Sequence, residues 1–349
     1  MKKVLFATTA LVATASVAAA DINLSGGGRF GIVYNSAGFT DANGGGAANG
    51  RQDTGETLVG KTRLEKRMTI NIDGSGSTDA GLEFGGRIQL RSDEARGSAI
   101  SGGNLFLGND MFRITVGNTA GAAVNRLSYF AGGVGLTGLH WANVSYNIGN
   151  NRFNLNTYSN RGTAGGAIND VVRLDFNVGG FGVSISTDRV GTVNATAPAA
   201  VGGSESSIAA SYNFGDWTVA AGYVDNFNNA NGTVATPSLD MASISVNGSI
   251  GDFGVGAAYS DKDTIGSKAV VYGSYNFGDT NVTAFVASTS EDTVGSAGIT
   301  QADVNGQTGS KTEFGIGFSH GLGGATLAGG ISRNFRKDTQ ADLGISFNF

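Results

Sequence analysis

Hydrophobic and polar side chains alternate along most of this chain with a period of two residues, and residues 341–349 show this most clearly. One parity is apolar and ends in aromatics: Ala341, Leu343, Ile345, Phe347 and Phe349. The other is small, polar or charged: Asp342, Gly344, Ser346 and Asn348. Because successive side chains of a strand point to opposite faces, these residues are predicted to form a strand with one apolar face. A terminal aromatic on that face is typical of a strand that ends at a membrane interface.

The same alternation predicts sixteen strands of roughly ten residues each. They are expected near residues 22–35, 60–73, 79–91, 103–109, 111–118, 170–178, 182–190, 205–214, 217–226, 239–250, 253–262, 268–277, 281–290, 311–320, 325–333 and 340–349. Tight Gly-Asp or Gly-Gly connections between aromatics alternate with long polar ones, such as 36–60, 226–238 and 291–310. Short turns on one side and long loops on the other indicate an all-β fold, a transmembrane antiparallel β-barrel with both ends of the chain in the periplasm.

The segment between 118 and 170 breaks the pattern and leaves two alternatives. Residues 139–148 and 152–159 would form an extra hairpin and raise the number of strands to eighteen. Otherwise residues 119–169 are one long insertion, which in a compact fold is expected to be functional. The second half of the segment is rich in asparagine and serine and makes a poor lipid-facing strand, so the insertion is favoured.

Residues 1–20 are typical of a secretory signal, with Lys2 and Lys3 before an apolar stretch and Ala18–Ala20 as the cleavage site. The mature barrel domain is then expected to span 21–349. No later apolar run is long enough for a transmembrane helix, a test that barrel strands escape because only alternate residues are apolar. Loss of the signal leaves 21 basic against 28 acidic side chains, so nucleic-acid binding is not expected. The chain has no cysteine, and it must be stable without disulfides.

Several blocks resemble the Rhodobacter-type general diffusion porins of the Gram-negative outer membrane. They are the Lys-Lys and Ala/Thr-rich signal, the opening Ile22–Gly26, Asp79–Gly85 and the closing Ala341–Phe349. The resemblance implies a sixteen-stranded homotrimer in outer-membrane lipid, with the insertion at 119–169 folded into the pore as a constriction loop. It also implies that the terminal aromatic, here Phe349, is an assembly signal for the barrel-assembly machinery.

Charged residues of the polar parity are expected to line the lumen. They are Arg29, Arg63, Arg67, Arg87, Arg91, Arg113 and Arg173 with Glu65, Glu83 and Asp175, joined by Arg126 of the insertion. The porins that the chain resembles set an acidic loop against a basic wall, but residues 119–169 contain no Asp or Glu and do contain Arg126, Arg152, Arg161 and His140. Arginine stays charged and presents a planar fork to anions, so the lumen is predicted to be electropositive and mildly anion-selective. Solvated, ion-paired and unselective barrel residues are the alternative.

Lys66 is an exception to the pattern, because Leu64 and Met68 place it on the apolar parity. A lysine facing lipid at the midplane costs roughly 2–4 kcal/mol, so we expect a bulge, a position near the interface or a subunit contact at Lys66.

The predicted function is passive diffusion of small hydrophilic solutes and ions, without cofactor or metal. A first alternative is a channel specific for sugars or anions, with Tyr129, Phe130, Trp141 and Tyr158 as candidate sugar contacts. A second is an outer-membrane enzyme, which His140 and His320 support weakly because no triad pattern accompanies them. A third is a soluble secreted adhesin. Two histidines and no cysteine argue against a zinc site, and calcium binding by Asp- and Asn-rich loops stays open.

Overall fold

The computed structural model describes residues 21–40, 58–93, 97–139, 143–148, 151–152, 171–188, 204–227, 239–262, 266–291, 311–335 and 337–349. These residues form one closed sheet, one two-stranded ribbon and the short helix α1 (Ala122–Arg126). No helix among them is long and apolar enough to cross a membrane. The predicted signal at 1–20, together with His140 and Arg161, lies outside the described residues.

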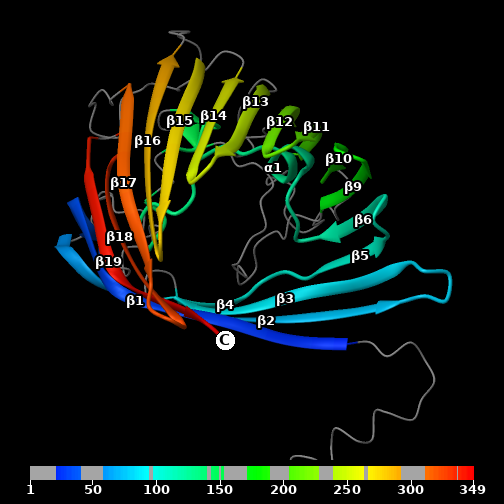
Figure 1. Ribbon diagram of the computed structural model, residues 1–349, viewed down its shortest axis with the longest axis horizontal. Helices are drawn as coiled ribbons and strands as arrows, with labels where there is room; N and C mark the ends of the chain where they lie inside the picture. The colour runs from blue at the N-terminus through cyan, green and yellow to red at the C-terminus, as the bar shows by residue number, and fades with distance from the viewer. Residues whose placement is uncertain are drawn as a thin grey trace, which may run out of the picture.

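The closed sheet is an antiparallel barrel in which each strand pairs with the next and β19 pairs back with β1. Figure 1 shows this succession, from β1 in blue to β19 in red. The strands are β1 (Asp21–Thr40), β2 (Leu58–Ser77), β3 (Glu83–Asp93), β4 (Gly97–Ile100), β5 (Asn104–Gly108), β6 (Phe112–Gly117), β9 (Val171–Val178), β10 (Phe181–Thr187), β11 (Ser204–Phe214), β12 (Trp217–Phe227), β13 (Leu239–Ile250), β14 (Phe253–Lys262), β15 (Gly266–Phe277), β16 (Thr280–Glu291), β17 (Thr312–Gly321), β18 (Ala325–Arg333) and β19 (Thr339–Asn348).

The described part of the chain confirms sixteen barrel strands. β4 and β5 are two halves of one strand, because both pair with β3, β4 near Leu90–Asp93 and β5 near Glu83–Arg87. The eighteen-strand alternative is wrong. Within residues 139–159, the described strands are β7 (Asn147–Ile148) and β8 (Asn151–Arg152), which pair with each other and not with the barrel.

The predicted strand bounds agree with the structure where the alternation is regular, as at β13 and β14, which match at both ends. Two differences have a local cause. The strand predicted from 79 begins at Glu83, because residues 78–82 form a turn in which Leu82 donates to the Thr78 hydroxyl and Gly81 has a φ of +79°. The alternation did not predict β4, whose four residues are too few to show a period.

The two faces of the barrel wall differ as the alternation predicts. On β9 the outward residues Leu174, Phe176 and Val178 are exposed, and the inward residues Arg173 and Asp175 are buried. The outward surface is apolar along most of the barrel and includes Ile22 at 73% and Leu64 at 73% exposure. Such a wide apolar outer surface is unsuited to water and suits the hydrocarbon of a bilayer.

Short turns and aromatic rings gather at one end of the barrel. β9–β10, β11–β12, β13–β14 and β15–β16 are joined by two-residue turns whose first residues, Gly179, Gly215, Gly251 and Gly278, have φ between +57° and +59°. Glycine adopts this left-handed conformation without steric cost, which is why it begins tight hairpin turns. Beside the turns, the ring of Phe253 contacts that of Tyr275 at 4.4 Å in a tilted arrangement, and Tyr275 stacks on Phe277 at 5.9 Å between ring centroids. The rings form part of an interfacial girdle.

Candidate pore constriction

The segment after β6 runs along the inner wall of the barrel rather than leaving it. α1 lies against β10, β11 and β12 on the inner side of the sheet (Figure 1). The Ala122 N–H donates to the hydroxyls of Ser186 and Ser207, at 2.7 and 3.1 Å. Further along, the Ser128 N–H donates to the Ser245 hydroxyl at 3.0 Å. Inward-facing serines of successive strands therefore position the segment.

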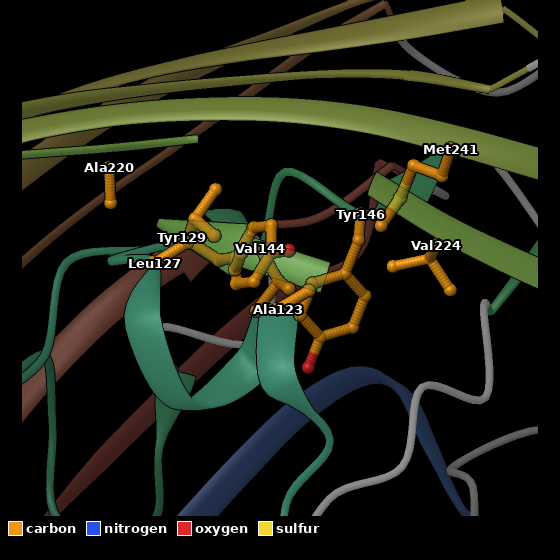
Figure 2. Packing of buried hydrophobic residues seen from close by; sticks show 9 residues of the cluster. Ala123, Leu127, Tyr129, Val144, Tyr146, Ala220, Val224 and Met241 are labelled. Carbon is orange, nitrogen blue, oxygen red and sulfur yellow. The ribbon is translucent and has the colours of Figure 1, made fainter. Parts of the chain in front are cut away.

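A small apolar core holds this segment against β11–β13. Leu127, Tyr129, Val144 and Tyr146 pack against wall residues that include Val224 and Met241, both fully buried (Figure 2). The rings of Tyr129 and Tyr146 meet edge to face at 5.0 Å between centroids. Burial raises the pKa of Tyr146 to about 12 and raises that of Tyr129 further, so both phenols are neutral near pH 7.

Asp342 of β19 fixes the far edge of the segment. Its carboxylate accepts the Leu136 N–H at 2.9 Å, the Thr137 N–H at 2.7 Å and the Thr137 hydroxyl at 2.7 Å. Gly135, with a φ of +78°, allows the backbone this close approach, because a Cβ there would lie 2.6 Å from a carboxylate oxygen of Asp342. On the neighbouring strand, Arg29 donates to the Leu136 carbonyl at 3.0 Å. The segment therefore reaches from β9 to the seam where the barrel closes.

Asp175 of β9 fixes the near edge. It accepts hydrogen bonds from Arg173 at 2.9 Å, from Asn125 at 3.1 Å and from the Ser184 hydroxyl at 2.5 Å. Arg173 also donates to the Thr119 hydroxyl and the Ala120 carbonyl. Arg126 donates to Ser184 and to the Val183 carbonyl, so its guanidinium lies against the wall. Burial lowers the pKa of Arg126, an effect that Asp175 opposes, and the group stays protonated.

The wall formed by β1, β2 and β3 carries the main group of arginines. Arg29 contacts Glu65 at 2.6 Å and Arg63 contacts the same carboxylate at 3.3 Å. Arg67 and Arg91 both contact one oxygen of Asp93, at 2.8 and 2.7 Å. The side chains of Glu65 and Asp93 are 1% and 3% exposed, whereas those of Arg63 and Arg67 are 28% and 26% exposed. Guanidinium groups, and not carboxylates, therefore form the lumen surface here.

Nearer the short turns the arginines are paired one to one. Arg87 contacts Asp73 at 2.5 Å, and Arg113 contacts Glu83 at 3.4 Å while its guanidinium lies 4.3 Å from the ring centroid of Phe106. The side chains of Arg87, Arg113 and Glu83 are exposed, and Asp73 is half-buried. Each of these ion pairs has no net charge, and exposed ion pairs contribute little to stability.

The structure places all the predicted lining residues on the inner side of the barrel but divides them by their contacts. Arg29, Arg63, Arg67, Arg87, Arg91 and Arg113 lie on the wall of β1–β6, with Glu65 and Glu83. Arg126, Arg173 and Asp175 lie where the inserted segment meets β9 and β10, and Arg29 contacts the same segment at Leu136. Three further residues belong to the site and were missed by the prediction from sequence: Asp73, Asp93 and Asp342. Each has the inward parity of its strand, and that parity could have identified them.

The remaining candidates lie apart from this site. Tyr129 is 2% exposed inside the apolar core, and His320 lies at the barrel end, hydrogen-bonded to Thr280 at 2.8 Å. Lys66 is exposed on the outer face, opposite Phe30. Phe349 pairs with Gly26 through two backbone hydrogen bonds. Within the described residues, no three His, Cys, Asp or Glu side chains gather as metal ligands do.

Comparison with known proteins agrees with this architecture. The family model of the Gram-negative porins matches residues 7–340. The porin of Fuscovulum blasticum is 25% identical over 339 residues, and that of Rhodobacter capsulatus is 25% identical over 360, each match covering 94% of this chain and 100% of the relative. A solved triple mutant of the Rhodopseudomonas blastica porin superposes with a TM-score of 0.67 at 23% identity, covering 94% of this chain and 100% of that one. The chain therefore belongs to the Gram-negative porins, which are non-enzymatic barrel proteins of the outer membrane.

Proposed function

We propose that this porin is a general diffusion channel for small hydrophilic solutes and ions, with a mild preference for anions. The observation that carries the preference is the layering of charge on β1–β3, where the guanidiniums of Arg63 and Arg67 face the lumen and the carboxylates of Glu65 and Asp93 lie beneath them. Selectivity in a pore follows the charges at its surface, so the exposed guanidiniums outweigh the net negative charge of the whole chain.

The inserted segment 119–169 is the proposed constriction. Sixteen strands enclose a lumen too wide for side chains to fill, so an inner segment has to set the size limit. Its described part is held at both edges, by Asp175 and by Asp342. It lies away from the arginines of β2 and β3, and Arg29 of β1 contacts it at the Leu136 carbonyl. Solutes would pass between this segment and the arginine-bearing wall.

A channel specific for sugars is the weaker candidate. Sugar recognition requires exposed aromatic faces along the path, but Tyr129 is buried and Phe130 packs against the same apolar core. The other two candidate aromatics, Trp141 and Tyr158, lie outside the described residues.

We also propose a homotrimer, removal of residues 1–20 on export, and recognition of Phe349 by the barrel-assembly machinery. The apolar outward surface around Lys66 supports a protein contact there, since lysine in lipid is costly. Crosslinking in mild detergent tests the trimer, N-terminal sequencing tests the cleavage, and the yield of folded barrel after deletion of Phe349 tests the assembly signal.

Bilayer electrophysiology tests the channel itself. The mature protein, refolded into a planar bilayer, should give large ohmic steps, and its reversal potential under a potassium chloride gradient should show chloride as the more permeant ion. Steps with cation preference would keep the channel and refute the charge argument. Inserted, folded protein without conductance would refute the diffusion function.

A further inference from the structure

Four arginines on the inner face of β1–β3 occupy neighbouring positions, and we call them the four-arginine cluster: Arg29, Arg63, Arg67 and Arg91. Arg29, Arg67 and Asp93 lie directly opposite one another across the three strands. Arg91 is opposite Thr69, one inward position from Arg67. Adjacent strands are about 4.8 Å apart, so the register brings Arg29, Arg67 and Arg91 together. Arg63, opposite Val33, joins them through its contact with Glu65.

The cluster carries more positive charge than its partners neutralise. Its four guanidiniums contact two carboxylates, those of Glu65 and Asp93, among the described residues. Counted over the part of the chain that the structure describes, this leaves a local excess of two positive charges. Elsewhere on the wall, Arg87 and Arg113 each have a carboxylate of their own.

One donor group in the cluster also lacks a partner among the described residues. The Nε of Arg91 is buried without a hydrogen-bond partner in the described structure, and the Arg91 side chain is only 10% exposed. Buried donors of this kind are rare in folded proteins and call for an explanation. Arg126 and Arg173 also outnumber their carboxylate, but hydroxyl and carbonyl groups of the wall and the inserted segment take up their donors.

We propose that the four-arginine cluster is a binding subsite for a doubly charged tetrahedral oxyanion, such as inorganic phosphate, sulfate or a phosphate monoester. The dianion would neutralise the excess charge, and its oxygens would accept from Arg67 and Arg91, whose planar forks match such groups. The subsite rests on the proposed function, because solutes reach it only through an aqueous lumen.

A binding site and a purely electrostatic filter differ in saturation. Phosphate added at mildly alkaline pH should reduce the chloride conductance of the refolded mature channel along a saturating curve, and sulfate should act in the same way. Glucose 6-phosphate shows whether monoesters enter the subsite. Block by it extends the subsite to monoesters, and block by the inorganic anions alone restricts the subsite to them.

Variants locate the site. Arg67→Gln and Arg91→Gln should each raise the half-saturating phosphate concentration about tenfold, the effect of losing one charge-assisted hydrogen-bonding group. Arg63→Gln provides a further variant if either of these fails to fold. Arg333→Gln is the matched control, because it removes the same charge from an exposed position at the end of β18 and should leave the curve unchanged.

The inference and the proposed function fail in different ways. In one outcome the channel prefers chloride, but its conductance falls linearly with phosphate concentration, or the block saturates at the same phosphate concentration in all variants. That outcome would overturn the subsite and leave the diffusion function standing. Equilibrium dialysis of labelled phosphate with the folded protein in detergent needs no conductance. Saturable binding that Arg67→Gln weakens supports the subsite even in a non-conducting preparation, and the absence of such binding overturns it.

Discussion

Removal of the Asp342 carboxylate should release the far edge of the inserted segment. In Asp342→Ala the amides of Leu136 and Thr137 and the Thr137 hydroxyl lose their common acceptor, which is buried and lies within 2.9 Å of all three. A hydrogen bond to a charged group contributes about 1.5–3 kcal/mol. Water from the lumen can replace part of the loss, so we expect the detached state to gain about 3 kcal/mol, or roughly a hundredfold in population.

Hydrogen exchange and single-channel recording measure this change. The Leu136 and Thr137 amides should exchange roughly a hundredfold faster in Asp342→Ala, and the open channel should become noisier as the segment moves. Asp342→Asn keeps one acceptor oxygen, so its exchange rates and current noise should lie between those of the unsubstituted protein and Asp342→Ala. Asp279→Ala, which removes an exposed carboxylate from a short turn, is the control. Unchanged exchange and current noise in Asp342→Ala would refute the idea that this carboxylate holds the segment.

Four other predictions concern the inserted segment, the arginine wall and the outer face. Met241→Ala should weaken the packing of the inserted segment by about 2–5 kcal/mol, because it empties part of the apolar core. Amide hydrogen exchange in the segment should become faster, whereas the thermal stability of the barrel should stay the same. Unaltered exchange would contradict this. Burial raises the pKa of Tyr146 in the folded protein, so the neutral phenol stabilises the bound inserted segment below about pH 10, and this stabilisation should be lost as the pH rises through about 12. The tyrosinate absorbance and the current noise should rise together over this pH range. Neither change should occur there in Tyr146→Phe. Asp93→Asn should shift the reversal potential towards stronger anion preference, because Arg67 and Arg91 lose their shared counter-charge; a shift towards cations would count against the layered-charge model. If Lys66 lies at a subunit contact, Lys66→Ala should give monomer on crosslinking in mild detergent. An intact trimer would show that the subunit contact does not depend on Lys66.

The amino-acid sequence by itself determined the barrel. Period-two alternation predicts the face on which each side chain lies, and glycine at the tight turns predicts where the chain reverses. The sixteen strands and the inward position of residues such as Arg67 and Glu83 therefore followed without tertiary information. The strand register then follows from the hairpins, and it is the register that sets Arg67 opposite Asp93.

Only the tertiary structure decided what the inner face contacts. Val224 and Met241 point inward and are apolar, which alternation cannot explain, since their partners Leu127 and Tyr146 lie far away in the sequence. Likewise, parity placed Arg173 among the lumen residues, but its contact with Thr119 turns it towards the inserted segment. Arg126, predicted as a lumen residue of the insertion, instead contacts Ser184 of the wall. A local pattern determines the direction in which a side chain points. The partner that it meets depends on where the long inserted segment runs inside the barrel. That path is stabilised by contacts between residues distant in the chain, so a local pattern does not reveal it.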